Sequence, residues 1–136
     1  MENIVLDSYI ASRKLETISF VKMDIEGYEP FALRGAEKSL RAGLIGAIYC
    51  EVADELLHRQ GSSARELIEL FRSFEYECFW CKEVDFQTGR APASHLRVPQ
   101  EGGASVRLAP MEAFPDGHQT DLIAVSRKGL FRNLLA

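Results

Sequence analysis

The stretch FVKMDIEGYE, residues 20–29, begins as an apolar run and ends in acidic residues. Asp24, Glu26 and Glu29 place three carboxylates within six positions, directly after a segment with the composition of a buried strand. Gly27 lies among them and permits a sharp turn into the helix, whatever φ the turn needs. This stretch therefore predicts a strand that ends in a charged turn, with a helix beginning soon afterwards.

The same reading extended along the chain predicts an α/β domain. The expected strands are 18–25, 46–52, 75–84 and 120–127. The first two are apolar on both faces, which is typical of a parallel sheet covered on both sides. A helix separates them, so the first half is a βαβ unit. No helix is expected between the last two strands, so we expect these two to pair antiparallel. From 85 to about 119 the pattern is irregular, and we interpret this part as a long insertion.

The helices are expected from their caps and periodicity. Asp7 or Ser8 is expected to cap a short helix through 9–15, and a second helix is expected over 30–42. Ser63 and Glu66 have the spacing of a capping box before a third helix. The apolar face of that helix is expected to consist of Leu67, Ile68, Phe71 and Phe74.

Composition excludes several classes of protein. The 136 residues suit one domain over 1–136, and a net charge of −4 argues against a nucleic-acid or anionic-membrane surface. No apolar stretch is long enough to span a membrane, and the first ten residues do not resemble a secretion signal, so we expect a cytoplasmic protein. The three cysteines suit a reducing compartment. Cys78 and Cys81 have C-x-x-C spacing, but no second pair completes a zinc site, and we expect a structural role without a metal.

Acidic side chains follow two neighbouring strands of the expected sheet. Ligands of open α/β sheets bind beyond the carboxyl ends of the strands. Asp24, Glu26 and Glu51 lie at those ends, so we expect them to converge. Lys22 shares a strand face with Asp24, and a pair shielded from water would lower the pKa of the lysine. Lys22 is therefore a candidate general base.

Each of these residues also has a plainer interpretation. Glu26 and Glu29 are placed to cap or favour the start of the next helix, and Lys22 can extend its amine to solvent. His58, on a loop after the second strand, is either an acid or base at the rim or an ordinary exposed histidine. Tyr28 either stacks on a ligand or packs against the protein.

The residues around this rim also carry a family resemblance. The segment LDSYIASRKLETISFVKMDIEGYEPFALRGAEKSL, followed by AIYCEV, resembles the carboxyl-terminal half of an FkbM-family methyltransferase. The matching positions are Leu6, Asp7, Lys22, Asp24, Glu26, Gly27, Glu29, Leu33, Gly35, Ala36 and Glu51. The resemblance implies a Rossmann-like class I methyltransferase fold with strand order 3-2-1-4-5-7-6. It also implies methyl transfer from S-adenosylmethionine to a hydroxyl of a sugar, polyketide or other small metabolite.

In that fold the first strand of this chain corresponds to strand 4, and Asp24 faces the methyl donor or the acceptor. Its mostly parallel sheet would end in an antiparallel pair. The candidate site residues are Lys22, Asp24 and His58 for catalysis, Asp24 and Glu26 for the cofactor, and Glu51 and Tyr28 for the acceptor. A variant in which Asp24 and Glu26 bind a hard cation is also open.

Two family features are missing from this sequence. The glycine-rich loop after strand 1 and the acid that ends strand 2 do not occur, so we expect a partial fold lacking strands 1–3. We interpret the chain as a fragment of a longer methyltransferase, or as one with a misassigned start, and expect no calorimetric binding of S-adenosylmethionine by the chain alone. The alternatives are an inert truncated product and a non-catalytic α/β module whose exposed first strand pairs with a partner chain or a second copy.

Overall fold

The computed structural model describes residues 4–80, 96–99, 105–114, 117 and 119–135. Its strands are β1 (Ile18–Met23), β2 (Ile45–Ala53), β3 (Tyr76–Trp80), β4 (Leu96–Pro99), β5 (Ser105–Pro110) and β6 (Gln119–Ser126). Its helices are α1 (Leu6–Ser12), α2 (Glu29–Arg34), α3 (Glu37–Arg41), α4 (Asp54–Arg59) and α5 (Ala64–Ser73), followed by the 3-10 helix η1 (Arg132–Leu135).

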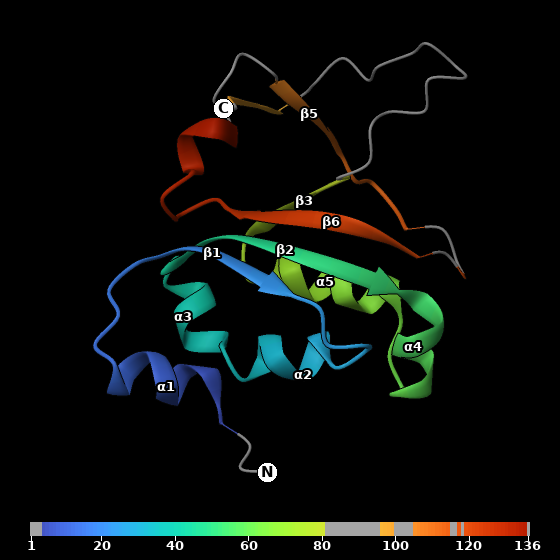
Figure 1. Cartoon of the computed structure of the whole chain (residues 1–136), viewed down its shortest axis with the longest axis horizontal. Coiled ribbons are helices and arrows are strands. Elements are labelled where there is room, and N and C mark those ends of the chain that lie inside the picture. Colours follow the sequence, from blue (N-terminus) through green and yellow to red (C-terminus); the bar gives the residue numbers. More distant parts are fainter. Residues whose placement is uncertain (1–3, 81–95, 100–104, 115–116, 118, 136) are drawn as a thin grey trace.

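The described strands form one mixed sheet in the order β1-β2-β6-β3-β5-β4 (Figure 1). The pair β1·β2 is parallel, and the other four described pairs are antiparallel. The expected antiparallel pairing of β3 with β6 is confirmed, but the expectation of a mostly parallel sheet is wrong. The reason is that β6 inserts between β2 and β3 and runs against both, and that β5 forms two more antiparallel pairs, with β3 and with β4. Strands β1, β2 and β3 therefore still point in one direction.

The part of the chain expected to be irregular contains two strands. β4 and β5 lie within 85–119 and pair antiparallel with each other. β5 also extends the sheet at β3, where Phe79 is opposite Pro110 and Trp80 is opposite Ala109. The prediction of an irregular insertion is therefore wrong for these strands, because their pairing depends on contacts across the chain that local patterns do not encode. Residues 81–95 lie outside the described residues.

The helices α1–α5 all lie on one side of the sheet (Figure 1), and the main core lies between them and the strands. Side chains that face this core alternate along each strand, as the pleat requires. The strand residues on this face include Met23, Ile48, Cys50, Val52, Cys78, Leu122 and Ala124. The opposite face carries a smaller cluster, in which Phe131 and Leu135 cover Ala47, Phe79 and Val125.

Strand β1 is less buried than its sequence predicts. It lies at the edge of the sheet, and its residues are not part of the cluster in which Leu135 of η1 packs against Ala47. Phe20 is 53% exposed, and Ser19 and Lys22 are exposed too. The prediction of burial on both faces is therefore confirmed for most of β2 and wrong for β1.

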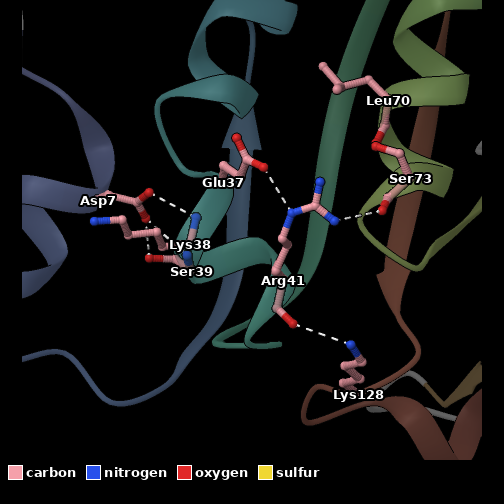
Figure 2. Close-up of polar contacts among 8 residues, drawn as sticks. All are labelled: Asp7, Glu37, Lys38, Ser39, Arg41, Leu70, Ser73 and Lys128. Carbon is pink, nitrogen blue, oxygen red and sulfur yellow. Dashed lines mark hydrogen bonds and ion pairs between the residues drawn. The ribbon is translucent and has the colours of Figure 1, made fainter.

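Asp7 does not cap α1, because it lies inside the helix and its carboxylate is used elsewhere. The residue before α1 is Val5, which makes no side-chain cap. Asp7 instead accepts hydrogen bonds from the backbone amides of Lys38 (2.9 Å) and Ser39 (3.0 Å) and from the Ser39 hydroxyl (2.6 Å), as Figure 2 shows. The Asp7 carboxylate thus accepts hydrogen bonds from two backbone amides in the first turn of α3. Amides in the first turn of a helix have no carbonyl partner within that helix.

The helix expected over 30–42 is divided. α2 ends at Arg34 and α3 begins at Glu37, with Gly35 and Ala36 between them. Figure 2 also shows Arg41 of α3, which binds Glu37 within its own helix and donates to the carbonyl of Ser73 at the end of α5. These contacts connect α1, α3 and α5, which pack on the same face of the sheet.

The third expected helix is confirmed as α5, with its apolar face in the core. The Ser63 hydroxyl accepts a hydrogen bond from the Glu66 amide (3.2 Å), which is one half of the capping box. The Glu66 carboxylate accepts instead from the Ser62 hydroxyl (2.9 Å), so the reciprocal half is replaced by a neighbouring serine.

Candidate functional site

The acidic residues expected to converge do line one hollow. Asp24 follows β1, and Glu51 lies toward the carboxyl end of β2, where Met23 and Cys50 are opposite each other in the parallel register. A cavity of about 130 Å³ lies between them. We call this the acidic rim, and its lining residues are Asp24, Glu26, Gly27, Glu29, Glu51, Ala53, Leu56 and Gln119. The hollow lies where the parallel pair ends, which is the ligand-binding edge of open α/β sheets.

The turn after β1 is held in an unusual backbone conformation. Glu26 has φ +53° and Gly27 has φ +96°, so the sharp turn expected at the glycine is confirmed. A Cβ on Gly27 would lie 2.6 Å from the carbonyl oxygen of Leu56 in α4. The backbone of α4 therefore leaves no room for a side chain at Gly27. This close approach holds the turn after β1 against α4.

Glu29 closes the same turn from within. It is 2% exposed and lies in the first turn of α2, where a carboxylate is favoured by the helix dipole. Its Oε1 accepts a hydrogen bond from the Ile25 amide at 3.3 Å. Tyr28 takes the cap position without a side-chain bond, so the interpretation of Glu26 as a side-chain cap of this helix is wrong.

Lys22 and Asp24 form the expected pair, but in solvent. Lys22 Nζ lies 3.6 Å from Asp24 Oδ2, and the two side chains are 64% and 45% exposed. The prediction that this pair is shielded from water is therefore wrong, because β1 is an edge strand whose outer face is bare. An exposed ion pair contributes only about 0–1 kcal/mol, and the shielding on which the prediction of a base at Lys22 rested is absent.

Glu51 is held at the rim by a contact from β6. Its Oε1 accepts a hydrogen bond from Gln119 Nε2 at 2.5 Å, and Asp121 is opposite it in the strand register. The thiol of Cys50, the residue before Glu51 in β2, is buried. Its burial, and then the neighbouring carboxylates beginning with Glu29, raise the pKa of Cys50. The rim thus gathers the carboxylates of Asp24, Glu26, Glu29 and Glu51 beside this strand.

Tyr28 is not brought to the rim. Its ring is 52% exposed and lies tilted against Phe31, with 6.0 Å between the ring centres. It does not line the acidic cavity. The structure therefore places this tyrosine in a small aromatic pair on the surface of α2.

His58 lies in α4 and not on a loop as expected. Its Nδ1 is 2.7 Å from the carbonyl oxygen of Asp54 and 3.4 Å from Asp54 Oδ1. The ring borders an open cleft of about 690 Å³ between α4 and the start of α5. We call this the α4–α5 cleft, and its lining residues are Asp54, Glu55, His58, Ser63, Arg65, Glu66 and Gly117.

Asp54 is the residue that the sequence reasoning missed. It is 3% exposed, and its two carboxylate oxygens accept from the amides of Ala64 and Gly117, each at 2.8 Å. Burial by itself would raise the pKa of Asp54, but these hydrogen bonds and the nearby His58 outweigh it and hold the pKa below its ordinary value. The spacing of four between Asp54 and His58 on a helix was the available signal.

The remaining candidates are a metal site and the pair of Cys78 and Cys81. Within the described ranges, no three His, Cys, Asp or Glu side chains are grouped closely enough to hold a metal ion. Cys78 is a buried free thiol whose burial raises its pKa to about 12, and Cys81 lies outside the described residues. None of the described helices is long and apolar enough to cross a bilayer.

Comparison with known proteins relates the first part of the chain to a protein family. A family model described as the methyltransferase FkbM domain matches residues 1–78, the N-terminal part of this chain. These residues include β1, β2 and helices α1–α5, with both the turn after β1 and the Asp54–His58 pair. No curated protein and no solved structure matches the chain.

Proposed function

This chain belongs to the FkbM methyltransferase family, and from that premise we propose that it serves in methyl transfer from S-adenosylmethionine to a hydroxyl of a small metabolite or sugar. The observation that carries the proposal is the convergence of Asp24, Glu26 and Glu51 at the carboxyl ends of two parallel strands. Family membership alone supports methyl transfer in general. The acidic rim supports placing the binding site at Asp24, Glu26 and Glu51.

The sheet supports a finer assignment within the class I fold. We assign β1, β2, β6 and β3 to strands 4, 5, 7 and 6 of that fold, because they are adjacent in this order and only β6 runs in the opposite direction. None of the described strands is assigned to strands 1–3. β4 and β5 extend the sheet beyond strand 6. In this assignment the acidic rim lies beyond strands 4 and 5.

The chemistry of the rim suits part of the methyl donor. S-adenosylmethionine carries an ammonium group, a sulfonium and ribose hydroxyls, all of which carboxylates stabilise by charge or by hydrogen bonds. The cavity of about 130 Å³ is smaller than the roughly 300–1,000 Å³ of typical ligand pockets. Asp24 and Glu26 would therefore hold one end of the donor, and the rest of it would extend beyond these residues.

The chain would contribute mainly by positioning the reactants. The donor supplies a methyl group on a positively charged sulfur. Asp24 would orient that end, and Glu51, held by Gln119, would accept a hydrogen bond from the acceptor hydroxyl. Correct alignment of the oxygen, the methyl carbon and the sulfur lowers the barrier for an in-line displacement.

Saturation-transfer NMR of S-adenosylmethionine tests this proposal, because it detects weak binding at a site that holds one end of a ligand. We expect saturation transfer to the donor from the wild-type chain and its loss in Asp24→Asn. The matched control is Glu16→Gln, which removes one exposed charge near the opposite end of β1 and is expected to behave as the wild type. Equal signals from all three proteins, or none from the wild type, would contradict the proposal.

A second function is favoured by the edge of the sheet. β1 is the terminal strand in the sheet order, and Phe20, Ile25, Tyr28 and Phe31 are exposed around it. An exposed strand edge is a template for pairing, so the alternative is a non-catalytic module that pairs with a second copy. Sedimentation analysis tests it: this reading expects a dimer that Phe20→Lys converts to a monomer. A wild-type monomer at high concentration would exclude pairing between copies.

A further inference from the structure

Asp54 lies where β2 ends and α4 begins, and its carboxylate binds two separate parts of the chain. Oδ1 accepts a hydrogen bond from the Ala64 amide at the start of α5, and Oδ2 accepts one from the Gly117 amide before β6. The pKa of Asp54 lies below its ordinary value because these bonds and the nearby His58 outweigh the effect of burial, so the carboxylate is ionised at neutral pH. Hydrogen bonds to an ionised acceptor are stronger than those to a neutral one. Asp54 therefore ties the turn before β6 firmly to the start of α4.

The bond to Gly117 continues the contact between β2 and β6 beyond their last strand pair. That pair is Ala53 with Gln119, the residues that end β2 and begin β6. Figure 1 shows the start of β6 beside the end of β2, where the chain turns into α4. The ends of strands open more easily than their middles. The Asp54–Gly117 bond therefore closes the end of the strand pair at which Gln119 lies.

Gln119 in turn determines where the Glu51 carboxylate lies. Its Nε2 donates a hydrogen bond to Glu51 Oε1, and both side chains line the acidic rim. Glu51 is directly opposite Asp121, so Gln119 is its diagonal neighbour on β6, and a long side chain is needed to span that gap. The charge of Asp121 repels the Glu51 carboxylate. The bond from Gln119 is thus what holds Glu51 at the hollow.

We infer that Asp54 is a positioning residue for the acidic rim: it holds Gly117, which fixes Gln119 at the start of β6, and Gln119 holds Glu51 at the hollow. This inference rests on the proposed function, in which Glu51 accepts a hydrogen bond from the acceptor hydroxyl, and it adds the residue that controls where Glu51 lies. Asp54 itself is not among the residues that line the hollow. Its effect on the rim therefore passes along the chain from Gly117 to Gln119.

The test follows the ¹³C resonance of the Glu51 side-chain carboxyl, which responds to the hydrogen bonds that this group accepts. The signal is assigned by its absence in Glu51→Gln, and Gln119→Ala gives the shift that accompanies loss of the bond. We expect Asp54→Ala and Gly117→Ala each to shift the resonance in the same direction as Gln119→Ala. An unchanged resonance in both variants would overturn the inference.

The variant at Gly117 keeps the test decisive if Asp54→Ala does not fold. Its φ of +71° disfavours a side chain, so the turn is strained while Asp54 and its bond to Ala64 stay in place. No described atom lies within 4 Å of a Cβ at this position, so the substitution causes no clash. In that case Gly117→Ala alone decides: a shifted Glu51 resonance supports the inference and an unchanged one overturns it.

Ser63→Ala is the matched control. The Ser63 hydroxyl accepts a hydrogen bond from the Glu66 amide, so this variant weakens the start of α5 without removing a bond of Asp54. We expect the Glu51 resonance to stay as in the wild type. A shift as large as that of Gly117→Ala would overturn the inference, because general loss of stability in this region would then be enough to move Glu51.

A double variant tests the route from Asp54 to Glu51. When Gln119 is already replaced by alanine, we expect Asp54→Ala to cause no further shift of the Glu51 resonance, because the two changes act on one path. Two shifts that add fully would overturn the inference, since Asp54 would then reach Glu51 by another path.

These measurements contain neither methyl donor nor acceptor, so their failure differs from a failure of the proposed function. An unchanged Glu51 resonance overturns the positioning role and leaves the donor site to the comparison of the wild type with Asp24→Asn. The expected shifts in a chain that gives no saturation transfer to S-adenosylmethionine would support the link from Asp54 to Glu51 and refute the proposed function.

Discussion

The contact of Asp7 with α3 allows a quantitative prediction about stability. Asp7→Ala removes three hydrogen bonds at once, from the Lys38 amide, the Ser39 amide and the Ser39 hydroxyl. Ser39 is 4% exposed, so its polar groups cannot be fully rehydrated. At about 1 kcal/mol for each bond, the free energy of unfolding should fall by about 3 kcal/mol. For a domain of this size the melting temperature should fall by roughly 10 °C.

Urea unfolding followed by circular dichroism measures this change. Ser39→Ala and the double variant complete a mutant cycle, in which we expect a coupling of about 1 kcal/mol between the two side chains. Glu16→Ala, an exposed carboxylate outside this contact, is the control and should change stability by less than about 0.5 kcal/mol. A loss below about 0.5 kcal/mol for Asp7→Ala, or full additivity in the cycle, would refute the reasoning.

The same contact should depend on pH. Burial alone would raise the pKa of Asp7, but the Ser39 hydroxyl and the amides of Lys38 and Ser39 outweigh it and hold the pKa below its ordinary value. The unfolded chain therefore binds the proton more tightly than the folded chain. The stabilisation is complete above the unfolded pKa of about 4 and is lost as pH falls through the lower folded pKa. The gap between the wild type and Asp7→Ala should narrow below about pH 4.

Three further predictions follow from buried groups. Gly27→Ala should destabilise the fold by about 1–3 kcal/mol in urea unfolding, because φ is +96° and the new Cβ would strike the Leu56 carbonyl; an unchanged stability would contradict the turn geometry. Phe71→Ala should cost about 3–5 kcal/mol by the same measurement, since its ring is fully buried, and a cost below 1 kcal/mol would show that it is not. Burial that raises the Cys78 pKa to about 12 should keep this thiol unalkylated at pH 8 until the chain unfolds, as mass spectrometry can show; rapid labelling of the folded chain would contradict this.

The strands and helices that depend on the local order of apolar and polar residues could be predicted from the sequence. The apolar runs of β1, β2, β3 and β6 and the apolar face of α5 follow from periodicity. The turn after β1 was found because a glycine lies between carboxylates directly after an apolar run. The convergence of Asp24 and Glu51 followed from the rule that parallel strands end at the same edge of the sheet.

The errors concern features that depend on distant parts of the chain. Whether β1 is buried on one face or two depends on its place in the sheet, which its sequence does not state. Its edge position is what exposes Phe20 and leaves the Lys22–Asp24 pair in water. Asp7 has the character of a cap, but which helix it serves depends on how α1 packs on α3.

The site shows the same division. The sequence indicates that His58 is a titratable group near a strand end, but it does not indicate that Asp54 is its partner. Asp54 is buried by α5 and by the turn before β6, and the sequence separates it from Gly117 by 63 positions. A position-by-position reading therefore sees only an acid at the start of a helix. The fold is what turns Asp54 and His58 into one unit.

The most direct test of the account is to locate the methyl donor on the chain. Ultraviolet irradiation with S-adenosylmethionine labelled in its methyl group, followed by peptide mapping, traps even weak binding covalently. We expect label in residues 20–29 and 46–53, competed by S-adenosylhomocysteine and reduced by Asp24→Asn but not by Glu16→Gln. Label confined to other segments, or no competed label at all, would contradict a donor site at the acidic rim.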